Sequence, residues 1–210
     1  MRPAATLQAL EVARDGSRRS LADFSARIEP GALVLARGGE REGSTLIKTL
    51  CRTLEPDRGR LVLLAGAETL DLTHAGARAV AWARKRWLGV FDGQLRALPN
   101  RTALRVVAGR DGGGERDREV LGDLGMSAAT EPVGLLEERE RTIVALAAAL
   151  VRPAPVLLLH RPLAGLEPAP RERVLALVDR AREAGSAVLA TVSAAESVTA
   201  DADVSLGGRR

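Results

Sequence analysis

Short, continuously apolar runs alternate along the chain with segments whose apolar residues recur at helical spacing. The runs at 32–36, 155–159 and 187–192 read ALVLA, PVLLL and AVLATV, which is typical of strands buried on both faces of a parallel sheet. Shorter strands are predicted at 6–12, 20–28, 60–65 and 88–91. Helices are predicted from Ser44 onward and at 74–86, 102–107, 116–124, 137–151 and 171–183. This alternation predicts an α/β fold, with a mostly parallel sheet flanked by helices.

The order of these segments also predicts the domain organisation. The chain has 210 residues, a length that suits one domain with a substantial core. Sheet-forming parts at about 1–92 and 153–210 enclose a mainly helical subregion at about 93–152, and the first strands form an antiparallel portion. We therefore expect a single domain over residues 1–210.

Composition narrows the class of protein. The longest charge-free apolar run covers 143–151, too short to span a bilayer, and the N-terminus lacks a signal-length apolar stretch. The single cysteine, Cys51, excludes a disulfide within the chain and a cysteine-based zinc site. These features predict a cytoplasmic protein without direct membrane insertion. With two Phe, two Trp and no Tyr, the chain lacks the aromatics of a single-stranded nucleic-acid platform, which argues against that partner.

Charge is distributed unevenly between the two halves of the chain. Residues 1–110 carry a net charge of +8 and residues 111–210 one of −4, which together give the overall +4. A basic half is suited to an acidic protein or to nucleic acid. A basic binding module is therefore one hypothesis for function.

A candidate phosphate-binding loop follows the first buried strand, where residues 36–45 read ARGGEREGST. Backbone N–H groups at a helix N-terminus form an anion cradle, and a lysine normally reaches the terminal phosphates. The candidate residues for ATP and Mg²⁺ are Gly38, Gly39, Gly43, Ser44 and Thr45, with the Ser44 hydroxyl as the Mg²⁺ ligand. The lysine expected between Gly43 and Ser44 is missing, and in the ungapped register Gly43 takes its place.

Two acidic residues, Glu40 and Glu42, stand within this loop. A carboxylate about 4 Å from a phosphate charge is repelled by roughly 4 kcal/mol at an effective dielectric near 20. One alternative is that a glutamate caps the empty helix N-terminus in place of the missing anion. Another is that Arg37 or Arg41 replaces the lysine as the cation.

A second motif lies in residues 156–167, which read VLLLHRPLAGLE. This segment resembles the Walker B strand and D-loop of ABC ATPases, where four apolar residues precede Asp-Glu-Pro-Thr. In that family the aspartate holds Mg²⁺ and the glutamate polarises the attacking water. Here His160 and Arg161 occupy those positions. Histidine is a poor Mg²⁺ ligand and arginine cannot act as a base, so we expect no catalytic residue; alternatively, His160 is only a polar residue ending a strand.

The remaining ABC motifs are altered in the same register. Residues 136–140 read LEERE in place of the signature Leu-Ser-Gly-Gly-Gln. Gly93 stands at the Q-loop position with Gln94 one place later, and Ser193 replaces the switch histidine. The resemblance covers residues 6–206. It implies a P-loop NTPase-like ABC nucleotide-binding domain that forms a homodimer, or a heterodimer with another ABC-type subunit, and works beside a permease.

A closer likeness is to the ABC-type L subunit of bacterial phosphonate carbon–phosphorus lyase systems. It rests on residues 70–72, 77–78, 85–90, 96–99 and 103–104, with further agreement at 55–59. This likeness implies a subunit of a phosphonate lyase complex rather than a permease partner.

The sequence leaves three functions open. The first is a pseudo-ATPase scaffold with weak or no ATP hydrolysis, since the lysine, both Walker B acids, the signature and the switch histidine are all replaced. The second is an ABC transporter-like subunit that keeps ATP binding or hydrolysis because a partner supplies residues. The third is the basic binding module.

Overall fold

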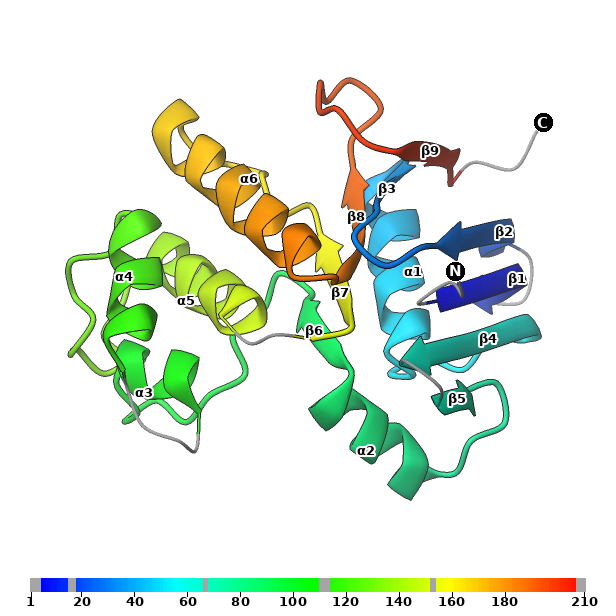
Figure 1. Cartoon of the computed structure of the whole chain (residues 1–210), viewed down its shortest axis with the longest axis horizontal. Coiled ribbons are helices and arrows are strands. Elements are labelled where there is room, and N and C mark those ends of the chain that lie inside the picture. Colours follow the sequence, from blue (N-terminus) through cyan, green and yellow to red (C-terminus); the bar gives the residue numbers. More distant parts are fainter. Residues whose placement is uncertain (1–4, 15–17, 66–67, 110–113, 152–153, 207–210) are drawn as a thin grey trace.

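The computed structural model describes residues 5–14, 18–65, 68–109, 114–151 and 154–206, which form two sheets and the helices around them (Figure 1). The strands and helices, in chain order, are β1 (Ala5–Arg14), β2 (Arg18–Ile28), β3 (Leu33–Arg37), α1 (Glu40–Leu50), β4 (Arg58–Ala65), β5 (Glu68–Asp71), α2 (Ala77–Arg86), β6 (Leu88–Phe91), α3 (Ala103–Ala108), α4 (Glu115–Asp123), α5 (Glu138–Leu150), β7 (Val156–His160), α6 (Pro168–Glu183), β8 (Ala187–Val192) and β9 (Ala202–Ser205).

The larger sheet is parallel and has the strand order β6-β7-β8-β3-β9. The smaller sheet is antiparallel, with the order β2-β1-β4-β5. Both confirm the predicted α/β class with an antiparallel N-terminal portion. The predicted strands 88–91 and 187–192 have the bounds of β6 and β8, because continuous apolar runs favour strands with both faces covered.

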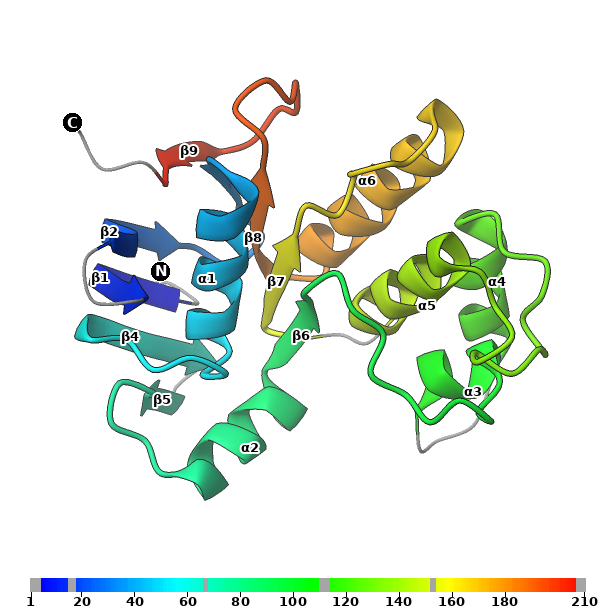
Figure 2. The ribbon, with the colours of Figure 1, turned by 180° about the vertical axis from the view of Figure 1, so that it is seen from behind.

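The parallel sheet separates two hydrophobic clusters. Val34 and Ala36 of β3 face one cluster, which also holds the apolar face of α1 and the inner side of the antiparallel sheet. Leu33 and Leu35 face the other, which holds apolar residues of α3, α4, α5 and α6. The alternation along β3 follows from the two-residue period of a strand. Helix α1 therefore lies between the two sheets, as both views of the molecule show (Figures 1 and 2).

Several boundaries differ from those predicted. Helix α1 begins at Glu40 rather than Ser44, and α2 begins at Ala77 rather than residue 74. Strands β5 and β9 were not predicted; both are short, mostly exposed strands at sheet edges, so they lack the apolar pattern of a buried strand. Residues 111–114 read DGGG, which predicts a loop, and most of this segment lies outside the described residues.

No helix in the described ranges is long and apolar enough to cross a bilayer.

Candidate functional site

The segment after β3 forms a helix where an open loop was expected. Gly39 is the N-cap of α1, and the Gly43 N–H donates to the Gly39 carbonyl oxygen at 3.0 Å. An N–H group engaged in this way is not available to a phosphate. The earlier start has a local cause: Glu40, Arg41 and Glu42 replace residues of a Gly-rich loop and favour helix. Acidic residues in the first turn also stabilise its N-terminus.

The side chains around Gly38 and Gly39 take up the space near this helix start. A Cβ on Gly38 would lie 2.6 Å from Cβ of Leu206, so this glycine permits the segment after β9 to pack closely. The Glu42 carboxylate lies against Gly39 so tightly that a side chain there would collide with it. Glu40 and Glu42 are acidic residues of the first turn of α1; that a glutamate stands in for the missing anion stays a prediction.

The end of β7 meets α1 at Gly43. His160, the last residue of β7, is buried, and its Nδ1 lies 2.9 Å from Oγ1 of Thr191 on β8. A Cβ on Gly43 would lie 3.0 Å from Thr191 Oγ1 and 3.3 Å from His160 Cε1. The position of the expected lysine is therefore one where any side chain displaces its neighbours.

Arg161 joins the Walker B position to the start of α1. Its Nη1 donates to Oε2 of Glu40 at 3.1 Å, while its backbone N–H donates to the carbonyl oxygen of Thr191 at 3.0 Å. The residue has a φ of 47°, a left-handed conformation that costs a side-chain-bearing residue about 1–2 kcal/mol. Arg161 thus links the end of β7 to the Glu40 carboxylate at the start of α1.

The other predicted site residues lie in different environments. Ser44 is half-buried on α1, and Thr45 is buried, with no hydrogen-bond partner for its Oγ1 in the described structure. Gln94 is exposed after β6, and its N–H donates to Asp92 Oδ1 at 3.3 Å. Ser193 is half-buried just after β8. The structure therefore brings Gly43, His160 and Arg161 together, whereas Gln94 faces solvent.

Residues 136–140, which the sequence places at the signature position, form local hydrogen bonds at the start of α5. The Glu137 N–H donates to Oε2 of Glu140 at 2.9 Å, so these two residues form part of a capping box at the start of α5. Arg141 donates through Nη1 to the Leu136 carbonyl oxygen at 2.7 Å. The Glu137 N–H at the start of α5 is therefore already engaged by a side chain of the same helix.

Two features of the cluster around Gly43, His160 and Arg161 were not predicted from the sequence. One is the presence of Thr191 beside His160, and the other is the ion pair between Glu40 and Arg161. Thr191 had a visible signal, because it is the one polar residue in the apolar run 187–192. Glu40 and Arg161 are 121 residues apart in sequence, so their pairing depends on how α1 and β7 are placed.

Burial gives His160 a specific electrostatic character. Desolvation lowers the pKa of His160 below its ordinary value of 6.5, and the neighbouring Arg161 guanidinium lowers it further, while the Glu40 carboxylate opposes both. The lowered pKa favours the neutral imidazole at neutral pH.

We expect this lowered pKa to make the protein less stable in mild acid. As pH falls through the unfolded-state value near 6.5, the unfolded chain takes up a proton that the folded chain resists, so stability present above that pH is lost below it. Melting temperatures measured from pH 8 to pH 5 should fall less in His160→Asn than in the parent. The matched control is His74→Asn, which changes the other, exposed histidine; a slope equal to that of His160→Asn would contradict the prediction.

Solved structures with the same architecture define the fold. The chain superimposes with a TM-score of 0.74 on an ATP-binding cassette solved as a dimer bound to ADP and phosphate, at 18% identity over 90% of this chain and 87% of that one. A putative ABC transporter ATP-binding protein from Pyrococcus furiosus gives a TM-score of 0.73 at 17% identity, covering 96% of each chain. The fold is the P-loop fold of an ATP-binding cassette.

Sequence relatives show the family. No family model matches the sequence. The chain is 31% identical to a cobalt import ATP-binding protein, CbiO, of Rhodobacter capsulatus, over 97% of this chain and 74% of the relative. It is 33% identical to a cytochrome c biogenesis ATP-binding export protein, CcmA, of Bordetella bronchiseptica, over 86% and 79%. The chain belongs to the ATP-binding cassette family of ABC transporters. These relatives give no support to the phosphonate lyase likeness, which stays a prediction.

Proposed function

We propose that this chain is the cassette subunit of an ABC-type transporter assembly, and that its own nucleotide site neither holds Mg²⁺ nor hydrolyses ATP. The observation that carries the second part is the Arg161–Glu40 ion pair beside His160. In a working site these positions supply two carboxylates and a glycine-rich cradle. Here a guanidinium, an imidazole and a helical turn stand in their place.

The chemistry of these side chains supports an inactive site. Mg²⁺ prefers hard oxygen ligands, and the neutral imidazole of His160 already lies against a threonine hydroxyl. Arg161 has no acceptor for a proton from the attacking water. An ATP phosphate would also approach Glu40 and Glu42 in the first turn of α1. Each of these replacements opposes ATP hydrolysis. When groups act as one catalytic unit, losing one of them costs about as much as losing several.

The altered signature segment supports the same proposal for a dimer. In the family this chain resembles, the N-terminus of the signature helix holds the γ-phosphate bound to the neighbouring cassette. Glu138 and Glu140 are acidic residues of the first turn of α5, and Glu140 caps its start. A phosphate placed there would be repelled. We infer that the chain weakens its partner's site as well as its own.

A second candidate is that the chain keeps ATP binding or hydrolysis with residues supplied by a partner. The relatives favour it, since CbiO and CcmA are both named ATP-binding proteins. Ser44 and the exposed Arg41 of α1 are the residues of this chain that would then contact phosphate. Either candidate is compatible with pairing through a cassette dimer and with a permease subunit.

The wider setting follows from the same proposal. We propose that residues 1–210 form one cassette domain and that this domain lies at the cytoplasmic face of the membrane. A phosphonate lyase complex remains the alternative assembly, and a basic binding module remains a hypothesis that rests on the uneven charge.

Measurements of MgATP binding and phosphate release on the purified parent chain distinguish the two candidate functions. We expect no MgATP binding by calorimetry up to millimolar ATP and no phosphate release above the rate of a buffer blank. Glu40→Gln should leave both results unchanged, since it removes one repulsive charge and rebuilds no ligand. Saturable MgATP binding by the parent would overturn the inactive-site proposal and favour partner-assisted ATP binding.

A further inference from the structure

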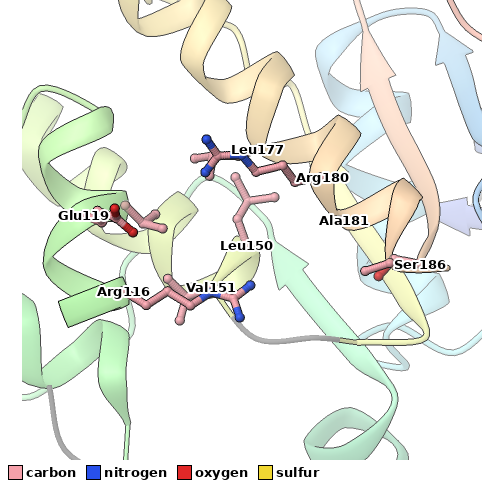
Figure 3. Close-up of a pocket in the computed structure, with 10 residues that line it drawn as sticks. Arg116, Glu119, Leu150, Val151, Leu177, Arg180, Ala181 and Ser186 are labelled. Carbon is pink, nitrogen blue, oxygen red and sulfur yellow. The ribbon is translucent and has the colours of Figure 1, made fainter. Parts of the chain in front are cut away.

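A cavity lies between the helical subregion and α6, away from the cluster around His160. It has a volume of about 450 Å³ and lies among α4, the end of α5, α6 and the start of β8 (Figure 3). Val120, Leu150, Leu177 and Ala181 form apolar walls. Its size is in the range of small-molecule sites, which are mostly apolar with a few polar groups that fix orientation.

Charged side chains from two helices line the same cavity. Arg116 comes from α4 and Arg180 from α6, and in the view of Figure 3 their guanidinium groups lie on either side of Leu150. Within the described residues Arg116 has no ion-pair partner, and Arg180 has only Asp123, at 4.0 Å in an exposed pair. Such a pair contributes little, so both guanidinium groups remain available to a ligand.

The remaining polar groups limit the ligand's charge. The Ser186 hydroxyl already donates to the Ala154 carbonyl oxygen at 2.7 Å, so it is not a free donor. Glu119 of α4 also lines the cavity and forms no ion pair within the described structure. Among the lining side chains, two guanidinium groups and one carboxylate leave a single net positive charge; Asp123, beside Arg180, does not line the cavity.

We propose that this cavity binds a small amphiphilic monoanion, with a medium-chain carboxylate as its chemical class. The apolar walls bury the chain because removing apolar surface from water is favourable. A carboxylate suits the planar donor fork of arginine. Glu119 disfavours a second negative charge. This site is separate from the nucleotide positions, so it stands whether or not the chain binds ATP.

Calorimetry with octanoate tests the proposal on the full purified chain. We expect saturable octanoate binding, and no binding of acetate, which has the head group alone, or of octyltrimethylammonium, which has the opposite charge. The variant Arg116→Gln/Arg180→Gln should bind octanoate at least tenfold more weakly. Ala181→Leu, which fills the cavity without changing charge, should also weaken binding.

Two further variants distinguish a specific octanoate site from nonspecific attraction between octanoate and basic surface residues. Arg78→Gln/Arg86→Gln removes the same charge from exposed positions of α2, which lies apart from α4 and α6 (Figures 1 and 2), and it should bind octanoate as the parent does. Glu119→Gln should bind severalfold more tightly, because it removes the repelling carboxylate. The proposal is overturned by absence of octanoate binding up to millimolar concentration, by equal binding of the cationic amphiphile, or by parent-like affinity in the Arg116→Gln/Arg180→Gln variant.

Discussion

We expect five replacements, E40G, E42G, G43K, H160D and R161E, to give this chain MgATP binding, which we propose that the parent lacks. E40G and E42G remove the two carboxylates and weaken the helical turn that closes the loop. G43K supplies the cation for the phosphates, and H160D supplies a hard oxygen ligand for Mg²⁺. R161E restores an acid beside the attacking water.

The replacements depend on one another for a structural reason. A Cβ at position 43 would lie 3.0 Å from Thr191 Oγ1 and 3.3 Å from His160 Cε1. A lysine there must displace both side chains, and the smaller aspartate at position 160 relieves one of the two contacts. Glu40 and Arg161 form an ion pair, so changing one alone leaves the other without its partner. We therefore expect G43K alone to bind no MgATP and to melt at a lower temperature than the parent.

Thermal melting and calorimetry measure the gain. A ligand at 100 times its Kd stabilises a protein by about 2.7 kcal/mol, which for a chain of this size raises Tm by about 5–10 °C. The matched control is E40Q/E42Q/H160N/R161Q, which removes the same charges and builds no ligand. MgATP binding by this control as tight as in the repaired variant would show that charge alone, rather than lost ligands, closes the site.

The second large effect is expected from Ile47→Ala on α1. Ile47 has no solvent exposure and belongs to the cluster between the two sheets, where α1 contacts β2, β7 and β8. Truncating a buried isoleucine to alanine costs about 2–5 kcal/mol, because contacts are lost and a cavity remains. We expect Tm to fall by at least about 4 °C.

Leu135→Ala is the control for this substitution. Leu135 is 77% exposed, and surface substitutions usually change stability by less than about 0.5 kcal/mol. Urea unfolding of the two variants beside the parent gives the comparison. An equal loss in both variants would mean that α1 does not pack between the sheets as described.

The sequence predicted which residue types occupy the candidate site, but it did not predict how their side chains contact one another. His160 and Arg161 were assigned from the apolar run that precedes them, because such a run predicts a buried strand whose end lies at the site edge. The loop motif predicts an open segment before Ser44, whereas Glu40, Arg41 and Glu42 favour helix, so α1 begins at Glu40 instead. Capping at Glu137 and Glu140, by contrast, follows from an acidic first turn.

The sequence by itself determined the layered α/β architecture, and it carries the prediction that the ATP-handling residues are replaced. Both are local properties: the apolar period selects strand or helix, and the identity of a side chain sets whether it can hold Mg²⁺ or accept a proton. The tertiary structure decided that Arg161 pairs with Glu40, that His160 and Thr191 crowd Gly43, and that β5 and β9 join the sheet edges. These features depend on contacts between segments distant in sequence, where packing and edge hydrogen bonds outweigh local preference.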